Sequence, residues 1–109
     1  TVLAASCPTP RIVFAQADAL ALGAAQAIKV ANPSQKIVVG GFDGDTAALE
    51  ALSKGVFDVT ATQQTQKMGR DAVANAVKLV AGEKVPPVQL MDATLTTKEN
   101  VAGFIANHP

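Results

Sequence analysis

The stretch VVGGFDGDT, residues 38–46, decides the fold class of this 109-residue chain. It begins with a β-branched apolar run, which is typical of a buried strand. Two glycines and a phenylalanine follow, and then Asp43, Gly44, Asp45 and Thr46. Asp45 stands where a helix N-cap is expected, because its side chain can accept hydrogen bonds from free backbone N–H groups. The stretch therefore predicts a strand that leads directly into a helix.

Units of the same kind occur before and after this stretch. Apolar runs without alternation are typical of parallel strands that are covered on both faces, and the segments between them have helical spacing. Asp18 is expected to cap the first helix. The alternation predicts an α/β fold with a parallel, Rossmann-like sheet. The expected strands are 11–15, 36–42 and 56–62, the helices are 19–31, 46–54 and 67–82, and an extended segment 88–97 and a short helix 98–106 follow.

Composition excludes several classes of function. Nine basic residues balance nine acidic ones without a charged block, and the aromatic residues are four phenylalanines. A nucleic-acid partner is therefore not expected, since it requires a clustered basic surface or stacking platforms. Cys7 has no second cysteine for an intrachain disulfide, and His108 is interpreted as an incidental residue of a frayed tail. We predict neither a metal site nor a cofactor.

The expected ligand site lies where the strands end. Parallel α/β sheets bind ligands at the carboxyl ends of their strands, where the strand-to-helix loops meet. In this chain the rule selects residues 16–18, 42–46 and 62–65, which are rich in polar side chains although the strands before them are apolar. This pattern indicates a site for a small polar ligand.

Phosphoryl transfer is one chemistry that the two aspartates suggest. An apolar strand followed by Asp-x-Asp resembles the first motif of the haloacid-dehalogenase-like phosphatases, in which Asp43 would be the nucleophile and Asp45 the acid/base. Lys67 or Lys78 would have to balance the phosphate charge. A later acidic pair should hold magnesium, but the chain offers only the isolated Asp92. The glycines of GGFDG also lack the order of a dinucleotide-binding loop.

Carbohydrate binding is the second chemistry. A carboxylate accepts hydrogen bonds from two sugar hydroxyls and strengthens them by its charge, while an amide donates and accepts at once. Asp43 at one strand end and Gln63 at the next are suited to this work. In this interpretation Asp45 and Asp18 are helix caps and contact no ligand.

Four motifs resemble the periplasmic sugar-binding proteins of the ribose-binding type, which belong to the type I periplasmic binding-protein superfamily. The similarity extends over nearly the whole chain from about residue 10, and it favours the carbohydrate interpretation. The motifs, in order, are VFAQADALALGA (13–24), VVGGFDG (38–44), ALSKGVFDVTATQQTQKMGRDAV (51–73) and TLTTKENV (94–101).

The resemblance implies specific ligand-binding residues. The aspartate after the GF pair and the glutamine at the end of the following strand contact the sugar in this family, and they correspond to Asp43 and Gln63. The asparagine of the family's FAQND motif also contacts sugar, but this chain has Ala17 at that position. An alanine has no hydrogen-bonding group, so either the ligand is not ribose or a neighbour such as Gln16 or Gln64 compensates. Ala17, Gln16 and Gln64 are expected to line the pocket.

The resemblance also implies an incomplete two-lobed fold. Residues 1–63 are expected to end the C-terminal lobe, residues 64–92 to cross to the N-terminal lobe as a helix and a strand, and residues 93–109 to return. The expected partners are a small carbohydrate, the permease of an ABC transporter, and a missing N-terminal lobe or a second copy of the chain. The implied function is non-enzymatic sugar binding in the periplasm, or outside the cytoplasm on a lipid anchor.

Lactose-repressor-type transcription factors are a second family with this fold and with sugar ligands. They typically have an extended stretch rich in proline and threonine where this chain has LSKGVFDVTAT, residues 52–62. That segment and the closing TTKENV favour the transport branch. The sugar-sensing domain of such a repressor remains an alternative.

Overall fold

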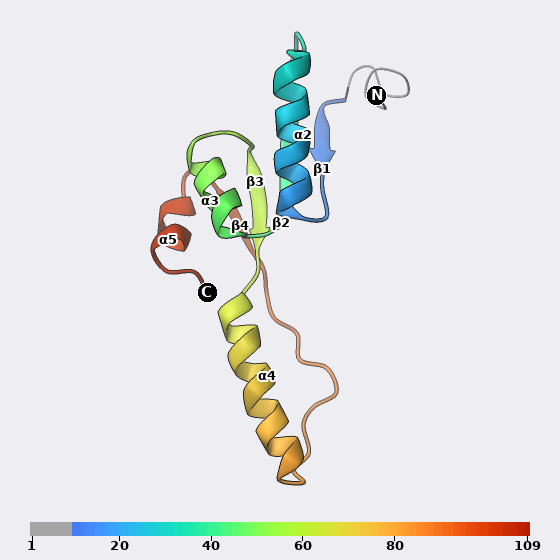
Figure 1. Cartoon of the computed structure of the whole chain (residues 1–109), viewed down its shortest axis with the longest axis vertical. Helices are drawn as coiled ribbons and strands as arrows, with labels where there is room; N and C mark the ends of the chain where they lie inside the picture. The colour runs from blue at the N-terminus through green and yellow to red at the C-terminus, as the bar shows by residue number, and fades with distance from the viewer. Residues whose placement is uncertain (1–9) are drawn as a thin grey trace.

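A computed structural model of the protein describes residues 10–109, so Cys7 lies outside the described residues. Strands and helices alternate along the chain, as predicted (Figure 1). The boundaries differ from the expected ones by a few residues at each end. The elements are β1 (Ile12–Phe14), α2 (Asp18–Ala31), β2 (Val38–Asp43), α3 (Thr46–Ser53), β3 (Val59–Thr62), α4 (Thr65–Val80), β4 (Thr94–Thr97) and α5 (Val101–Ala106).

One four-stranded sheet organises the described residues, with strand order β1-β2-β3-β4. β1, β2 and β3 are parallel, which confirms the predicted βαβ units. β4 runs antiparallel to β3 and pairs Thr94 with Thr62. The sheet is therefore mixed. The loops that follow β1, β2 and β3 lie together at the edge of the sheet where these parallel strands end.

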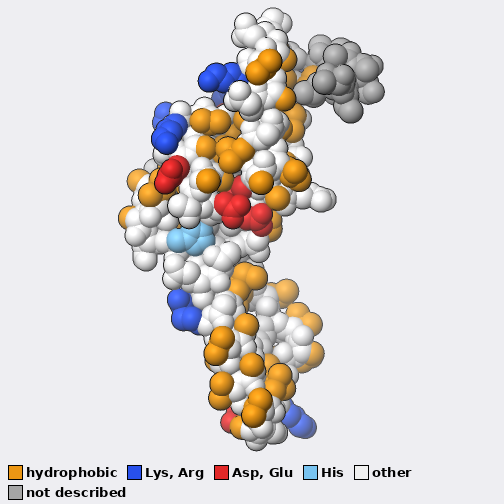
Figure 2. Space-filling view, viewed as in Figure 1, with side chains coloured by type: hydrophobic (Ala, Val, Ile, Leu, Met, Phe, Trp, Pro, Cys, Tyr) orange, Lys and Arg blue, Asp and Glu red, His pale blue; other side chains and the backbone are white. Residues whose placement is uncertain are grey.

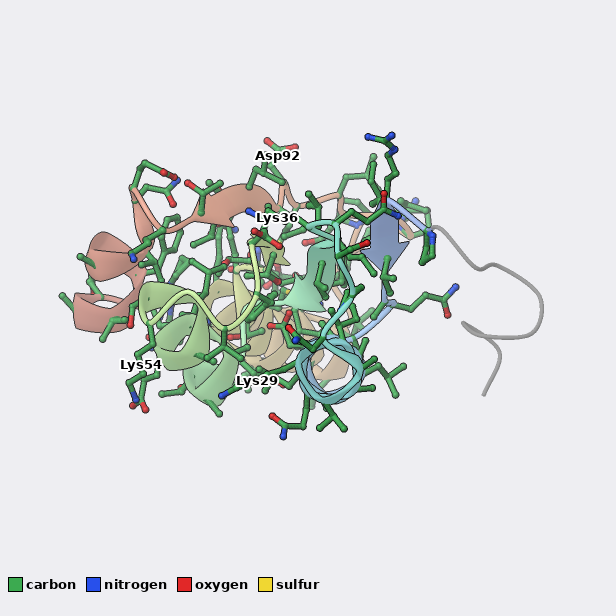
Figure 3. All side chains as sticks on the ribbon, turned by 90° about the horizontal axis from the view of Figure 1, so that it is seen from above. Lys29, Lys36, Lys54 and Asp92 are labelled. Atoms are coloured by element: carbon green, nitrogen blue, oxygen red, sulfur yellow. The ribbon has the colours of Figure 1, made fainter. Side chains whose placement is uncertain are left out.

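The hydrophobic core lies on one face of this sheet. Seen from above, α2 and α3 lie on the same side of the strands (Figure 3), as right-handed crossovers between sequential neighbours require. α5 packs against α3. Burial of apolar surface in this layer is the main stabilising term of the fold. The buried apolar residues are Ala21, Ala25, Val39, Ala48, Leu49, Leu52, Phe57 and Val101.

The second face of the sheet is bare within the described part of the chain, and here the prediction of strands covered on both faces is wrong. Ile12 and Phe14 alternate with the inward Val13 on β1 and are 70% and 66% exposed. Phe57 is buried in the core, whereas Phe14 is exposed. Residues 10–109 provide helices for one face only, although their strands have apolar side chains on both.

Helix α4 projects from the end of the sheet and makes the molecule long, with extents of 60 × 31 × 16 Å (Figure 1). It has no buried residue, and apolar side chains are spread along it (Figure 2). The chain returns along α4 without the strand that was expected before residue 92, since no described strand lies beside it to pair with. α4 and the return segment border an open groove of about 460 Å³.

Within residues 10–109, no helix combines the length and the apolar character needed to cross a membrane.

Candidate functional site

Asp43 and Gln63, the two residues expected to bind the ligand, lie in contact at the carboxyl-end edge of the sheet. The register pairs Asp43 with Thr62, so Gln63 follows directly beside it. Gln63 Nε2 donates a hydrogen bond of 2.8 Å to Asp43 Oδ1. The backbone N–H of Gln63 donates to the Asp43 carbonyl at 2.9 Å. Both side chains are half-buried, so they are fixed by contacts and still reach solvent.

The backbone at this strand end has an uncommon conformation. Asp43 has φ +119° and Gly44 has φ +81°. Positive φ is rare for a residue with a side chain, and an aspartate that adopts it must be stabilised by its surroundings. At Gly44 only glycine fits, because a Cβ would lie 2.5 Å from Thr62 Cγ2 and 2.8 Å from Thr62 Cα. The glycine lets the chain turn tightly across the end of β3.

Asp18 is fully buried, and its predicted role as a helix cap is wrong. It is the first residue of α2, and the N-cap position, Ala17, makes no side-chain cap bond. Asp18 Oδ2 instead accepts hydrogen bonds from the backbone N–H groups of Gly44 at 2.7 Å and Asp45 at 2.9 Å. Its Oδ1 accepts from Thr60 Oγ1 at 2.6 Å. One carboxylate thus joins α2, the β2–α3 loop and β3.

Asp45 occupies the N-cap position of α3, as predicted, but its side chain makes no cap hydrogen bond. The residue is exposed, and its carboxylate lies beside the cavity at the end of β2. The placement of Asp45 is therefore confirmed, whereas the expected cap bond is not formed.

A small cavity of about 290 Å³ lies beside Asp43. The C-terminal tail forms part of its wall, so the interpretation of His108 as a residue of a frayed tail is wrong. His108 is half-buried, and its Nε2 is 2.8 Å from the Gly44 carbonyl oxygen. The Pro109 carbonyl accepts a hydrogen bond of 3.0 Å from Gln66 N–H. The cavity is lined by Asp43, Gly44, Asp45, Thr46, Thr65, Gln66 and His108.

The three other expected pocket residues lie in the loops at this edge. Ala17 stands between β1 and α2, directly before the buried Asp18, and Gln16 is exposed. Gln64 is the residue before α4, and its Nε2 donates a hydrogen bond of 3.0 Å to the Asp92 carbonyl, on the return segment. Among the described residues, no hydrogen bond joins Gln16 or Gln64 to Asp43. Their contact with a ligand stays a prediction.

The structure gives the phosphatase alternative no support. Lys67, one of the two lysines proposed to balance a phosphate, forms an ion pair with Asp71 one turn along α4. Within residues 10–109 there is no group of three or more histidine, cysteine or acidic side chains placed to hold a metal ion. The side chain of Asp43 is engaged by a neutral amide.

Sequence reasoning missed two features of this edge. The buried Thr60 gave no signal, because a threonine in a strand is ordinary. The contact of His108 with Gly44 joins residues 64 positions apart and could not be derived from local sequence.

Comparison with known proteins gives consistent relatives. A family model described as periplasmic binding protein domain matches residues 1–84. A putative rhizopine-binding protein of Rhizobium meliloti is 38% identical over 93 residues, which are 84% of this chain and 30% of that protein. The ribose import binding protein RbsB of Haemophilus influenzae is 40% identical over 83 residues, 76% of this chain and 28% of that protein.

Solved structures agree with the sequence relatives. A periplasmic solute-binding protein of an ABC transporter from Actinobacillus succinogenes, with bound D-allose, superimposes with a TM-score of 0.84 at 29% identity. The match includes 94% of this chain and 36% of that one. A solute-binding protein from Bacillus halodurans with bound myo-inositol gives a TM-score of 0.79 at 36% identity, over 87% of this chain and 33% of that one.

The chain spans about 30% of the length of the sequence relatives. The family model nevertheless matches most of its residues, and the folds superimpose closely. The chain belongs to the periplasmic binding protein family.

Proposed function

We propose that this chain is the carbohydrate-binding segment of a sugar receptor that serves an ABC transporter. The observation that supports this most is the pair of Asp43 and Gln63, which are joined by a hydrogen bond of 2.8 Å at the open end of the sheet. A sugar would bind there without covalent chemistry, and the receptor would then deliver it to a membrane permease.

The pair has the chemistry that a neutral polyol requires. The described contacts use one oxygen of Asp43 and the amide nitrogen of Gln63. Asp43 Oδ2 and Gln63 Oε1 remain available to accept hydrogen bonds from hydroxyl groups. A hydrogen bond to a charged acceptor contributes about 1.5–3 kcal/mol, more than a neutral one. Because the amide fixes the carboxylate before the ligand arrives, less rotamer entropy is lost on binding.

The uncovered surfaces of the chain agree with a larger two-lobed protein. We assign residues 1–63 to the end of one lobe, 64–92 to a crossing into the other, and 93–109 to the return. The bare sheet face at Ile12 and Phe14 would be covered by further helices of the first lobe. The exposed apolar side chains of α4 would pack in the second lobe, which a chain about 30% as long as its relatives lacks. A missing lobe is therefore favoured over a second copy.

Closure of two lobes would be the mechanism. A ligand that contacts both lobes favours the closed state over the open one by its differential affinity. In this scheme Asp43 and Gln63 are the contacts contributed by the lobe described here. The protein would act outside the cytoplasm, in the periplasm or on a lipid anchor, where its permease partner receives the sugar.

The names of the relatives support transport over the alternatives. Ribose import, D-apiose import and D-allose-binding proteins stand among them. This favours a transport receptor over a repressor's sensor domain, and sugar binding over phosphoryl transfer.

Isothermal titration calorimetry on the full-length protein tests the proposal. The panel is D-ribose, D-allose, D-apiose and myo-inositol, and we expect at least one of them to bind. The Asp43→Ala variant should then lose at least about ten-fold in affinity, since one charged hydrogen bond contributes about 1.5–3 kcal/mol. Glu50→Ala is the matched control, because Glu50 is an exposed acidic residue on α3. An unchanged affinity in Asp43→Ala would contradict the assignment.

A further inference from the structure

The conformation of Asp43 requires restraints beyond those that Gln63 provides. Its φ of +119° is unfavourable for a residue with a Cβ, and the next residue, Gly44, has φ +81°. The side-chain hydrogen bond from Gln63 fixes the carboxylate, and the Gln63 N–H holds the Asp43 carbonyl at 2.9 Å, but neither bond restrains the N–H groups of Gly44 and Asp45. A restraint on these two N–H groups is also needed to keep this turn from relaxing.

Asp18 supplies that restraint from a different element. Its side chain is 0% exposed, so it has no access to a ligand. One of its oxygens receives both N–H groups that follow Asp43, those of Gly44 at 2.7 Å and Asp45 at 2.9 Å. Two N–H groups that point at one anion form a shallow cradle, a geometry that ordinary extended backbone does not give. The turn and the buried carboxylate therefore stabilise each other.

A hydrogen bond and a glycine position Asp18 itself. Thr60, also 0% exposed, donates its hydroxyl to Asp18 Oδ1 at 2.6 Å. Gly41 leaves the space that this oxygen occupies, because a Cβ at position 41 would lie 2.3 Å from Asp18 Oδ1 and 3.1 Å from Ala21 Cβ. The neighbouring Gly40 has no such constraint, since its nearest heavy atom would be Val59 Cγ1 at 3.4 Å.

We infer that Asp18 is a positioning residue for the binding site: its buried carboxylate holds the turn after β2, and thereby sets the backbone and carboxylate of Asp43. The inference deepens the proposed sugar-binding function and depends on it for the ligand. Asp18 touches no ligand, so its whole effect on affinity should pass through Asp43.

A double-mutant cycle in the full-length protein tests this dependence. Asp18→Asn keeps the shape and one accepting oxygen but removes the charge, and charged hydrogen bonds are roughly twice as strong as neutral ones. We expect calorimetry with the best-binding sugar of the panel to show a loss of roughly three- to ten-fold. In the Asp43→Ala background the same change should cost less than two-fold. An equal loss in both backgrounds, or no loss in either, would overturn the inference.

A second pair of variants perturbs Asp18 from the side of the sheet. Gly41→Ala forces the Asp18 carboxylate to move and should weaken sugar binding, whereas the matched Gly40→Ala should bind within two-fold of wild type. Equal affinity of the two variants would contradict the inference. Thermal unfolding of each variant identifies any loss that arises from unfolded protein.

A readout without ligand separates this inference from the proposed function. In NMR spectra of the full-length protein, the HN–Hα coupling and backbone shifts of Asp43 report its φ. We expect Asp18→Asn and Gly41→Ala to shift them and to move the Gly44 amide proton upfield, while Gly40→Ala does neither. If the wild-type protein binds no sugar, the proposed function fails, and these spectra alone decide whether Asp18 positions Asp43. An unchanged Asp43 conformation in Asp18→Asn would overturn the positioning role.

Discussion

Replacing Gly44 by alanine should destabilise the protein strongly, because two separate penalties apply at this position. The first is the backbone conformation, since φ +81° costs an alanine about 1–2 kcal/mol. The second is steric. The new Cβ would lie 2.8 Å from Thr62 Cα, a backbone atom of β3 that moves only with its strand. Such overpacking costs about 1–3 kcal/mol. The expected loss in free energy of unfolding is therefore about 2–5 kcal/mol.

Gly55→Ala separates the two penalties. Gly55 has φ +72°, but a Cβ there would meet only Lys98 Nζ at 3.9 Å, so it should pay the backbone cost of about 1–2 kcal/mol alone. Denaturant unfolding of the full-length protein measures both variants against wild type. Gly44→Ala should be less stable than Gly55→Ala by about 1–3 kcal/mol. Equal stabilities would refute the reasoning that β3 closes over the turn.

Three further perturbations test other parts of the fold. Thr62 and Thr96 share a buried hydrogen bond of 2.6 Å, and Thr96 also donates to a carbonyl of its own strand. Thr96→Val should therefore lower the free energy of unfolding by about 1–3 kcal/mol, and Thr62→Val should lower it by less. The double variant should lose less than the sum of the two single losses, and additive losses in denaturant unfolding would contradict this. Burial raises the pKa of Asp58, but its hydrogen bonds to Lys36 and a backbone N–H, with the Lys36 charge, hold that pKa below its ordinary value. The stability that Asp58 contributes should be complete above the ordinary pKa of aspartate, and it should be lost as the pH falls through the lowered pKa of Asp58. Melting curves measured over a pH series test this. The same acid dependence in Asp58→Asn as in wild type would argue against it. Leu52→Ala on α3, fully buried in wild type, should cost about 2–5 kcal/mol in denaturant unfolding, and a cost below 1 kcal/mol would show that this core is not the stabilising one.

Local sequence predicted the repeating units and the proximity of Asp43 and Gln63 at one edge of the sheet. The apolar run before Asp43 and the helical spacing after it are enough to place a strand and a helix, and the parallel-sheet rule then brings Gln63 beside Asp43. This part is confirmed by the register of β2 with β3 and by the hydrogen bond between the two side chains.

Sequence reasoning failed where a residue's role depends on distant neighbours. Asp18 has the local pattern of a helix cap, yet its three hydrogen bonds reach 26 to 42 positions along the chain. His108 lies at the end of the sequence, and only the folded chain shows that it touches Gly44. Phe14 has a core residue's character but is exposed, because no described element covers that face of β1.

A crystal structure of the full-length protein with its sugar tests the central claim most directly. The account predicts ring hydroxyls within hydrogen-bond distance of Asp43 Oδ2 and Gln63, with Asp18 buried behind the turn. An Asp43 side chain that coordinates a metal ion, or that faces the interior while the sugar binds elsewhere, would contradict it.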